Sequence, residues 1–596
     1  MKQRKRSEID VKDTWDLTYI FKDEDEFNKC LKDAYEDIKK ITSYKGKILN
    51  NSDTLLSYLE YSDMIERKLY KLYYYAHLNL DVDTTNTISQ EREGKVTNLL
   101  QEYSVLSSFV LPELLKGDYE KVKKFVKENK KLEKYRFNLE EVYRYQEHSL
   151  SEENEKLLST ISRSFIADEA FEALTDADIT FPNLIINGSE VELTESNYNT
   201  FIRSNDRIIR CDAFTKLLTT YGNYKNTLAK TFSGNIYLLT SMAKIKKFAS
   251  SIEASLYADN IPVSVYNKLI DTVSKNLNVL YKYYDLKKEV LKVDELHLYD
   301  VYASMVNDIE KKYSFDEARN IVIDALKVLG DDYISKLKKA FTERWIDKYN
   351  NKGKRTGAYS SGFYDTKPYL LLNFEGRYED VTTLAHELGH SMHTYYSTHN
   401  QPYNLSSYNI FVAEVASTVN ELLLVHYLIE NASSKEEKLF LLNQLMELYK
   451  ATIFRQVMFA EFERDMHKDL ENGEILTNEY LSTKYFELVK KYFGKDVVCD
   501  NLIKNEWMRI PHFYYNFYVY KYAIGLSSAT KIVNAILNRE QGALEKYLAF
   551  LKTGGSMYPA DELKIAGVDI YDNKVYEEAI NTFNQYIDEF IKEYNK

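Results

Sequence analysis

One short segment of the chain has the residue types and spacing needed to hold a metal ion. Residues 384–393 read Leu-Ala-His386-Glu387-Leu-Gly-His390-Ser-Met-His393 and contain the pattern HExxH. On a helix, two residues four positions apart lie ~40° apart around the axis and one turn along it, so both imidazoles can reach one ion. Glu387 lies ~100° round from His386, where its carboxylate flanks the ion. This pattern predicts two metal ligands and a general base acting on metal-bound water.

The composition argues against an accidental match. With 10 His in 596 residues, we expect about 0.01 chance occurrences of HExxH per chain. The neighbouring residues Ala385, Leu388, Gly389 and Ser391 are uncharged, as a buried metal-binding helix requires. Because a mid-helix glycine costs ~1 kcal/mol relative to alanine, Gly389 indicates the close approach of another group.

A third ligand must come from another part of the sequence. A metzincin would have a glycine three residues after the second histidine and a third histidine six residues after it. His393 and Tyr396 occupy these positions, so that pattern fails. A loop at 397–408 and a second helix at 409–426 follow, and the helix carries Glu414 between apolar neighbours. A carboxylate in such surroundings must be paired or bound to a metal. If the two helices pack antiparallel, His390 and Glu414 lie at similar height, and His₂Glu plus one water forms an open catalytic zinc site.

Two further residues lie near these candidate ligands. Glu421 follows Glu414 by seven positions on nearly the same face, where it either holds a ligand imidazole or is an ordinary helix glutamate. His393 lies on the same stripe as His386. As a fourth protein ligand it would close the water position, so we expect it to support the site from behind or to face the substrate.

A second candidate group lies in residues 509–525, which read Arg-Ile-Pro-His512-Phe-Tyr-Tyr515-Asn-Phe-Tyr518-Val-Tyr520-Lys-Tyr522-Ala-Ile-Gly. If this segment is helical, His512, Tyr515 and Tyr522 fall within a sector of ~80°. Phenol and imidazole donors on one side could stabilise an oxyanion. The chain has 52 Tyr, so an aromatic stripe is also typical of core packing, and both interpretations stay open.

The elements that must position these residues are mostly helices. Apolar residues recur at three- and four-residue spacing over residues 13–175, including predicted helices at 24–41, 53–80 and 151–174. Asn187-Gly188 between two alternating runs predicts a hairpin at 179–194. We place a boundary near residue 205, which predicts an N-terminal helical domain at 1–205 and a catalytic domain at 206–596. Glycines and a short apolar run at 368–374 predict a small β element within 352–376.

Composition excludes several classes of protein. The chain has 19 Gly and 7 Pro, too few for an all-β or repeated βαβ fold. A net charge of −12 argues against nucleic acid as a partner. Cys30, Cys211 and Cys499 form neither a disulfide framework nor a CxxC site. The N-terminal residues lack the apolar run of a secretory signal, and no stretch approaches the ~18 apolar residues that span a bilayer. We therefore expect a cytoplasmic protein without a membrane partner.

At these residues the chain resembles the oligoendopeptidase F family, within the thimet-oligopeptidase-like zinc metallopeptidases. HELGHSMH together with the downstream Glu-Val-Ala-Ser is highly specific, and the other resembling pieces are supportive. These pieces extend nearly end to end, at 14–17, 254–262, 296–300, 353–360, 368–374, 386–393, 411–418 and 512–515.

The resemblance implies a fold and a set of functional residues. The fold is mainly α, with two helical halves around a deep channel, zinc at its floor and a small β element beside the metal site. Glu387 would be general base and acid. The implied ligands of one zinc ion per chain are His386, His390 and Glu414. The implied contacts to substrate or oxyanion are His512, Tyr515 and Tyr522, with Tyr518 and Tyr520 as near competitors.

We predict a zinc-dependent oligoendopeptidase that hydrolyses internal bonds of short unfolded peptides, as a monomer or weak homo-oligomer. The strand at 368–374 could pair with extended substrate backbone. One alternative is a zinc carboxypeptidase or dipeptidase, in which Lys354 and Arg355 would cap the substrate carboxylate. A second alternative is a non-catalytic helical peptide-binding protein.

Overall fold

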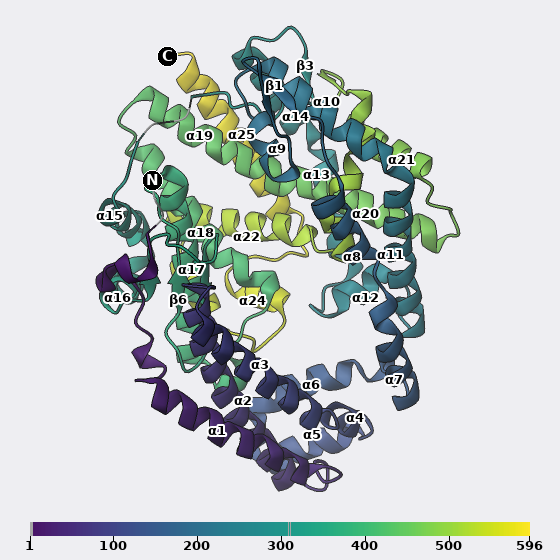
Figure 1. The fold of residues 1–596 in the computed structure, drawn as a ribbon, viewed down its shortest axis with the longest axis vertical. Helices are drawn as coiled ribbons and strands as arrows, with labels where there is room; N and C mark the ends of the chain where they lie inside the picture. Colours follow the sequence, from purple (N-terminus) through teal and green to yellow (C-terminus); the bar gives the residue numbers. More distant parts are fainter. Residues whose placement is uncertain (1–3, 308, 310) are drawn as a thin grey trace. The chain divides into compact units, whose positions relative to one another are not determined.

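Helices form most of this protein (Figure 1). The computed structural model describes residues 4–307, 309 and 311–596. Within these residues the strands are two or three residues long and form small sheets of two or three strands. The mainly α class predicted from the sequence is therefore confirmed.

The chain divides into two compact units that interleave along the sequence. Unit 1 comprises residues 1–149, 311–427 and 532–568, and unit 2 comprises residues 150–310, 428–531 and 569–596. These units do not follow the division predicted near residue 205. The reason is long-range packing, since helices late in the chain pack against helices from residues 150–310 to complete unit 2. The division into domains at 205 stays a prediction.

Unit 1 contains the N-terminal helices, a three-stranded sheet and the HExxH helix. Its helices are α1 (Glu24–Lys40), α2 (Ser52–Asp81), α3 (Thr87–Ser107), α4 (Val110–Leu115), α5 (Tyr119–Glu128), α6 (Arg136–Arg144), α15 (Phe315–Ala325), α16 (Gly330–Thr342), α17 (Tyr378–Asn400), most of α18 (Ile410–Glu430), α23 (Ala543–Phe550) and α24 (Pro559–Ile565). Its strands are β4 (Ile346–Asp347), β5 (Tyr359–Ser361) and β6 (Tyr369–Leu371).

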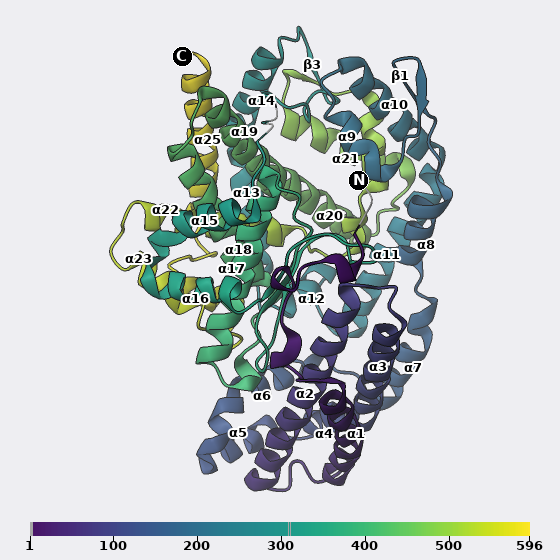
Figure 2. The same cartoon turned by 60° about the vertical axis from the view of Figure 1, so that its left-hand side comes forward.

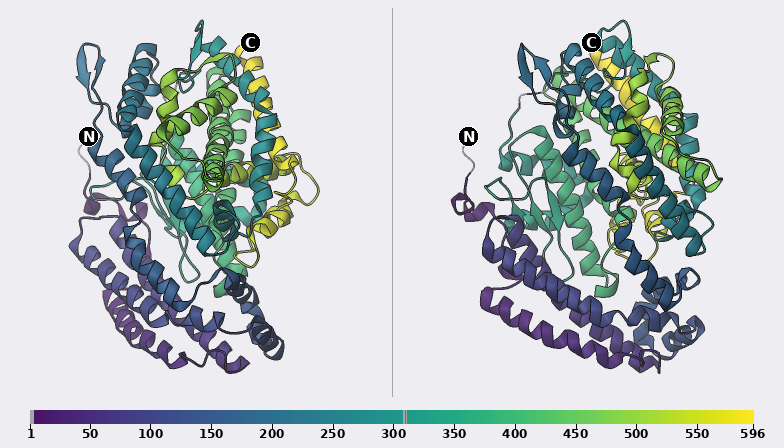
Figure 3. Two further views of the ribbon diagram at one scale, coloured as in Figure 1. Left: turned by 90° about the vertical axis from the view of Figure 1, so that its right-hand side faces the viewer. Right: turned by 45° about the vertical axis from the view of Figure 1, so that its right-hand side comes forward.

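The first helices of unit 1 form where capping residues and apolar spacing coincide. The Asp23 side chain accepts a hydrogen bond from the backbone of Glu26 to start α1, and Asn51 caps α2 in the same way. Helices α1, α2 and α3 lie side by side (Figure 3), and their apolar faces form one core. The helices predicted at 24–41 and 53–80 are confirmed.

The small β element of unit 1 is the sheet β4-β6-β5. Strand β6 pairs parallel with β4 and antiparallel with β5. The β element predicted at 352–376 is thus confirmed. The prediction that its 368–374 strand pairs with substrate is wrong, because both sides of β6 already carry a strand. Strand β5 lies at the edge of this sheet instead.

Helices α17 and α18 lie next to one another in unit 1 (Figure 2). Helix α17 continues to Asn400, so the loop before α18 is shorter than the predicted 397–408. In the described part of the chain, α18 alone has the length and composition to cross a membrane, with a mean hydropathy of 1.3 over its most apolar window. The expectation that no stretch approaches this limit is wrong for α18. Buried core helices pass the same test, and 56% of the window is buried.

Unit 2 holds the remaining helices and four short strands of the described residues. Its helices are α7 (Glu152–Ile161), α8 (Ala167–Glu172), α9 (Glu195–Ile202), α10 (Arg207–Asn223), α11 (Lys225–Ile245), α12 (Ser251–Tyr257), α13 (Val263–Lys275), α14 (Leu277–Leu291), α19 (Lys435–Tyr449), α20 (Gln456–Glu471), α21 (Asn478–Phe493), the first part of α22 (Tyr520–Leu537) and α25 (Lys574–Tyr594). Its strands are β1 (Leu184–Ile186), β2 (Ser189–Val191), β3 (Leu296–His297) and β7 (Val497–Val498).

Two sequence predictions in unit 2 have different outcomes. The hairpin is confirmed as β1–β2, with Asn187 and Gly188 at φ 53° and 78°, the left-handed conformations that a two-residue hairpin turn requires. The single helix predicted at 151–174 is wrong. It is broken into α7 and α8, because the backbone at Phe165 and Ile166 leaves helical geometry.

Candidate active site

The HExxH helix α17 is held against α18 by a very close backbone approach. Ala385, Leu388 and Met392 are fully buried. A Cβ built on Gly389 would lie 2.5 Å from Ser417 Cα and 2.6 Å from the Ala416 carbonyl oxygen. The close approach predicted from this mid-helix glycine is therefore confirmed, and the approaching group is the backbone of α18.

We expect Gly389→Ala to separate the two helices. The added methyl group would collide with backbone atoms of α18, which cannot move away as a flexible side chain could. Overpacking of this kind costs about 1–3 kcal/mol or more, and it would move Glu414 away from the histidines. The expected result is a lower melting temperature together with reduced metal content. Gly94→Ala on α3, where a Cβ meets nothing within 4 Å, is the matched control and should leave both unchanged.

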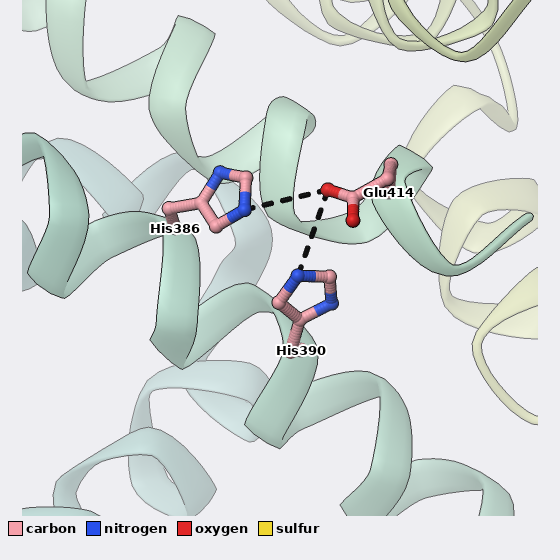
Figure 4. Close-up of side chains that lie close together, drawn as sticks. All are labelled: His386, His390 and Glu414. Carbon is pink, nitrogen blue, oxygen red and sulfur yellow. Dashed lines mark ion pairs between the residues drawn. The ribbon is translucent and has the colours of Figure 1, made fainter. Parts of the chain in front are cut away.

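Side chains of His386, His390 and Glu414 converge on one point (Figure 4). Each contributes one ligand atom, and these atoms all lie within 4.8 Å of one another. The distances from Glu414 Oε2 to the Nε2 atoms of His386 and His390 are 3.4 and 3.6 Å. His386 of α17 lies against Glu421 of α18, and Gly389 lies against Ser417, so the two helices run antiparallel, which is the condition stated for a shared metal site.

The donor set fits a zinc ion. In a tetrahedral site with bonds of ~2.0–2.1 Å, neighbouring ligand atoms lie ~3.4 Å apart, close to the two separations above. Two imidazole nitrogens and one carboxylate oxygen match the donors of open catalytic zinc sites. The carboxylate side of the site also reaches solvent, since the Glu414 side chain is half exposed.

Glu421 lies directly behind His386. Its Oε2 is 3.3 Å from His386 Nδ1, on the opposite side of the ring from Glu414. This contact favours the interpretation of Glu421 as the acceptor that orients a ligand imidazole. Burial lowers the pKa of His386, but hydrogen bonds to Glu414 and Glu421 outweigh it and raise the pKa to about 10.

Changing Glu421 to glutamine is expected to weaken metal binding by about 10–100-fold while leaving the three ligand atoms in place. The neutral amide would still fill the space but would orient and polarise the His386 ring less well. Competition with a chromogenic chelator measures the affinity. If the variant binds zinc as tightly as the unchanged protein, Glu421 is an ordinary helix glutamate.

Glu387 is the buried carboxylate beside the ligands. Only 7% of it is exposed, and the backbone N–H of Ser360 in strand β5 lies near enough to its carboxylate to counteract part of the pKa increase. The Ser360 and Ser391 hydroxyls also lie 2.8 Å apart, which ties β5 to α17. Burial, with the nearby Glu414 charge, raises the pKa of Glu387 to about 7. A carboxyl group with such a pKa can both accept and release a proton near neutral pH.

His393 supports the helix rather than facing a substrate. It is fully buried and stacks on Tyr408 with ring centroids 3.7 Å apart. Neither ring nitrogen has a hydrogen-bond partner among the described residues, and burial lowers the pKa of His393 to about 3. Of the two expectations for this residue, the substrate-facing one is wrong.

The second candidate group lies in unit 2 and is not a single helix. His512 belongs to a short 3₁₀ helix (Pro511–Tyr514), whereas Tyr522 belongs to α22. The helical arrangement assumed for residues 509–525 is therefore wrong. The fold nevertheless brings the rings together, with centroid distances from His512 of 5.5 Å to Tyr515 and 6.1 Å to Tyr522.

The tyrosines that could contact a substrate differ in how deeply they are buried. Tyr520 is 1% exposed and packs against Tyr266, so it cannot meet a substrate. Tyr515 is 48% exposed. Tyr518 lies with its ring 5.3 Å from that of Tyr522 and stays a neighbour of the group. Sequence reasoning missed the turn at Asn516 and Phe517, both at positive φ, because neither is the glycine that marks such turns.

The chain is similar to known peptidases over most of its length. The sequence model of Peptidase family M3 matches residues 200–582, and that of the Oligopeptidase F N-terminal region matches residues 113–181. Oligopeptidase PepF of Bacillus subtilis is 42% identical over 98% of this chain and 88% of its own length. Group B oligopeptidase PepB of Streptococcus agalactiae is 38% identical over 97% of both chains.

Two solved structures are also similar to this chain over nearly its whole length. The oligoendopeptidase-F of Enterococcus faecium matches with a TM-score of 0.73 and 34% identity, over 96% of this chain and 99% of its own. A protein from Chlamydophila abortus matches with a TM-score of 0.94 and 38% identity, over 99% and 100% of the two chains.

A helical fold that sets two imidazoles, a carboxylate and a buried glutamate around one point defines a metal-dependent peptidase. The chain belongs to peptidase family M3, in its oligopeptidase F branch.

Proposed function

We propose that the protein is a zinc-dependent oligoendopeptidase that cuts internal bonds of short unfolded peptides. The observation that carries the proposal is the convergence of His386, His390 and Glu414 beside the buried Glu387. The relatives named oligopeptidase and oligoendopeptidase F, which match nearly the whole chain, support the substrate class.

His386, His390 and Glu414 would hold one zinc ion. When bound, the ion supplies Lewis acidity, which lowers the pKa of water toward ~7 and polarises a carbonyl group. The Glu387 carboxylate accepts a proton from the attacking water and later delivers it to the nitrogen of the leaving amine.

Strand β5 is the element best suited to align an extended peptide. It lies at the edge of its sheet and its Ser360 contacts Glu387. Backbone pairing along such an edge gives affinity with little side-chain preference. We therefore propose that a substrate strand adds to β5 instead of to β6.

We further propose that His512, Tyr515 and Tyr522 contact the substrate or its developing oxyanion. Their rings gather in unit 2, and Tyr515 is half exposed. Burial lowers the pKa of His512, which favours a neutral imidazole. A neutral ring and phenol groups are hydrogen-bond donors suited to a developing negative charge.

The carboxypeptidase alternative depends on Lys354 and Arg355 being available to bind the carboxylate of a substrate. Lys354 is fully buried, and its Nζ donates to Asp347, to the Tyr349 carbonyl and to the Leu372 carbonyl. Arg355 pairs with Asp81 at 3.0 Å. Lys354 is therefore unavailable to cap a substrate carboxylate, whereas Arg355 remains half exposed beside its partner Asp81.

The state of the cysteines bears on the cellular setting. All three cysteines are free thiols, which is typical of reducing compartments. We propose a cytoplasmic enzyme, acting as a monomer or weak homo-oligomer.

An internally quenched peptide of about ten residues and a folded protein, each with and without a chelator, test this function. We expect chelator-sensitive cleavage of the peptide alone. Mass spectrometry of the products should show internal cuts, whereas stepwise trimming from one end would support the carboxypeptidase alternative. Elemental analysis of the purified protein distinguishes zinc from cobalt or manganese, which a mixed N/O site also admits. Cleavage that persists in excess chelator would refute the proposal.

A further inference from the structure

We infer that Glu463, a buried residue of α20, is a positioning residue that holds the turn between Tyr515 and Tyr522 in its active conformation. The inference rests on the proposed contact of His512, Tyr515 and Tyr522 with substrate. Glu463 itself lies inside unit 2, touches none of these three side chains in the contacts described, and is 0% exposed.

The turn that joins the aromatic residues has a strained backbone. Asn516 and Phe517 have φ of 52° and 58°. Two successive residues with side chains in the left-handed region are uncommon: asparagine adopts it more readily than most residues, but for Phe517 it costs about 1–2 kcal/mol. Such a conformation persists only where surrounding contacts enforce it. Because Tyr515 comes directly before this turn and Tyr522 five residues after it, the turn decides how both rings meet His512.

Two hydrogen bonds from other helices enforce the turn. The Phe517 N–H donates to Glu463 Oε1 at 2.6 Å. The Ser255 hydroxyl, from α12, donates to the Asn516 carbonyl at 2.7 Å. The Phe517 N–H and the Asn516 carbonyl belong to the same peptide unit. Both of its polar groups are therefore hydrogen-bonded to side chains of other helices, which fixes the orientation of this peptide.

The Phe517 side chain adds a third constraint. It is 1% exposed, and its ring centroid lies 4.4 Å from that of His467 and 5.9 Å from that of Tyr266. His467 is held in turn, since its Nδ1 lies 2.9 Å from the Ser251 hydroxyl. The turn therefore cannot relax by swinging Phe517 outward without opening a buried aromatic cluster.

The surroundings of Glu463 suit a hydrogen-bond acceptor better than a member of an ion pair. No cation pairs with it among the described residues, and its second oxygen has no hydrogen-bond partner there. Burial raises the pKa of Glu463 to about 8, so the carboxyl group is largely protonated at neutral pH. A glutamine at this position keeps the shape and the acceptor oxygen, whereas a leucine leaves the Phe517 N–H buried and unpaired.

The experiment compares Glu463→Gln with Glu463→Leu in the full-length chain. We expect Glu463→Leu to lower kcat for the quenched peptide by about tenfold or more with a smaller change in KM, because small displacements of donors weaken the transition state most. Glu463→Gln should stay within about threefold of the unchanged enzyme. Metal content should be equal in all variants, since the candidate ligands belong to unit 1.

A second readout does not depend on activity. Hydrogen exchange of the Phe517 amide should be slow in the unchanged protein and in Glu463→Gln, and faster in Glu463→Leu. If the unchanged protein fails to cleave any peptide, the proposed function fails, yet this exchange measurement still decides whether Glu463 holds the turn. Should Glu463→Leu not fold, Ser255→Ala removes the other hydrogen bond and should change kcat and exchange in the same direction.

Glu461→Leu is the matched control, because it removes another buried glutamate from the same helix. Glu461 bonds to Lys491 and Tyr492 rather than to the turn. We expect it to lower the melting temperature while kcat and Phe517 exchange stay unchanged. The inference is overturned if Glu463→Leu keeps the original kcat and exchange rate, if Glu463→Gln is as impaired as Glu463→Leu, or if Glu461→Leu lowers kcat equally.

Discussion

Replacing Glu387 by glutamine should lower kcat for peptide cleavage by about 10²–10⁴-fold, the range that general acid–base groups contribute. The amide keeps the size of the carboxylate in this buried position. It cannot take a proton from the attacking water or return one to the leaving amine. The loss should therefore appear in kcat, measured with the quenched peptide under saturating conditions.

Two further measurements separate this chemical effect from damage to the site. Metal content and melting temperature should match those of the unchanged protein, because Glu387 is not among the three converging ligand atoms. Glu379→Gln, which alters an exposed glutamate in the first turn of the same helix, should keep full activity. A Glu387→Gln variant that cleaves peptide at the original rate would eliminate Glu387 as the proton carrier.

Removing Glu414, the proposed third ligand, should have an effect of a different kind. We expect Glu414→Ala to lose both stoichiometric metal and peptidase activity, because two imidazoles alone hold a divalent ion poorly. The fold should survive, since the Glu414 side chain is half exposed and its polar contacts lie within the site itself. Elemental analysis and circular dichroism measure the two properties separately.

Zinc titration during thermal unfolding gives a readout that needs no substrate. A ligand that binds only the native state stabilises it by ~2.7 kcal/mol at a hundredfold excess over Kd. The melting temperature of the unchanged protein should therefore rise with zinc, and that of Glu414→Ala should not. Glu430→Ala, at the exposed end of the same helix, should respond like the unchanged protein. Equal zinc responses in Glu414→Ala and the unchanged protein would contradict Glu414 as a ligand.

Local sequence determined much of the candidate metal site. The four-residue spacing of His386 and His390 is set by helix geometry, so their common direction follows once the segment is helical. Glu414 stood out because apolar residues surround it, and Gly389 because a mid-helix glycine carries a cost without a contact. Each of these signals involves residues within about one helical turn of one another. The antiparallel pair α17–α18 satisfies all of them together.

Other features depended on contacts between distant parts of the chain. Strands β4 and β5 make β6 the central strand of its sheet, and the residues of β6 themselves do not reveal whether it is a central or an edge strand. The single helix assumed for the spacing argument at 509–525 is absent because a left-handed turn interrupts it, and this turn is bonded to Glu463 more than fifty residues earlier. The interleaving of the two compact units likewise arises from helices that return late in the chain.

The amino-acid sequence by itself determined the helical class, the one-turn spacing of His386 and His390 and the chemistry proposed for this pair, because short-range periodicity and residue type suffice for each of them. Only the tertiary structure decided which strand edge remains open, where His393 points, and how the aromatic turn is anchored. These outcomes depend on which side chains and backbone groups meet across long chain separations, and no local pattern carries that information.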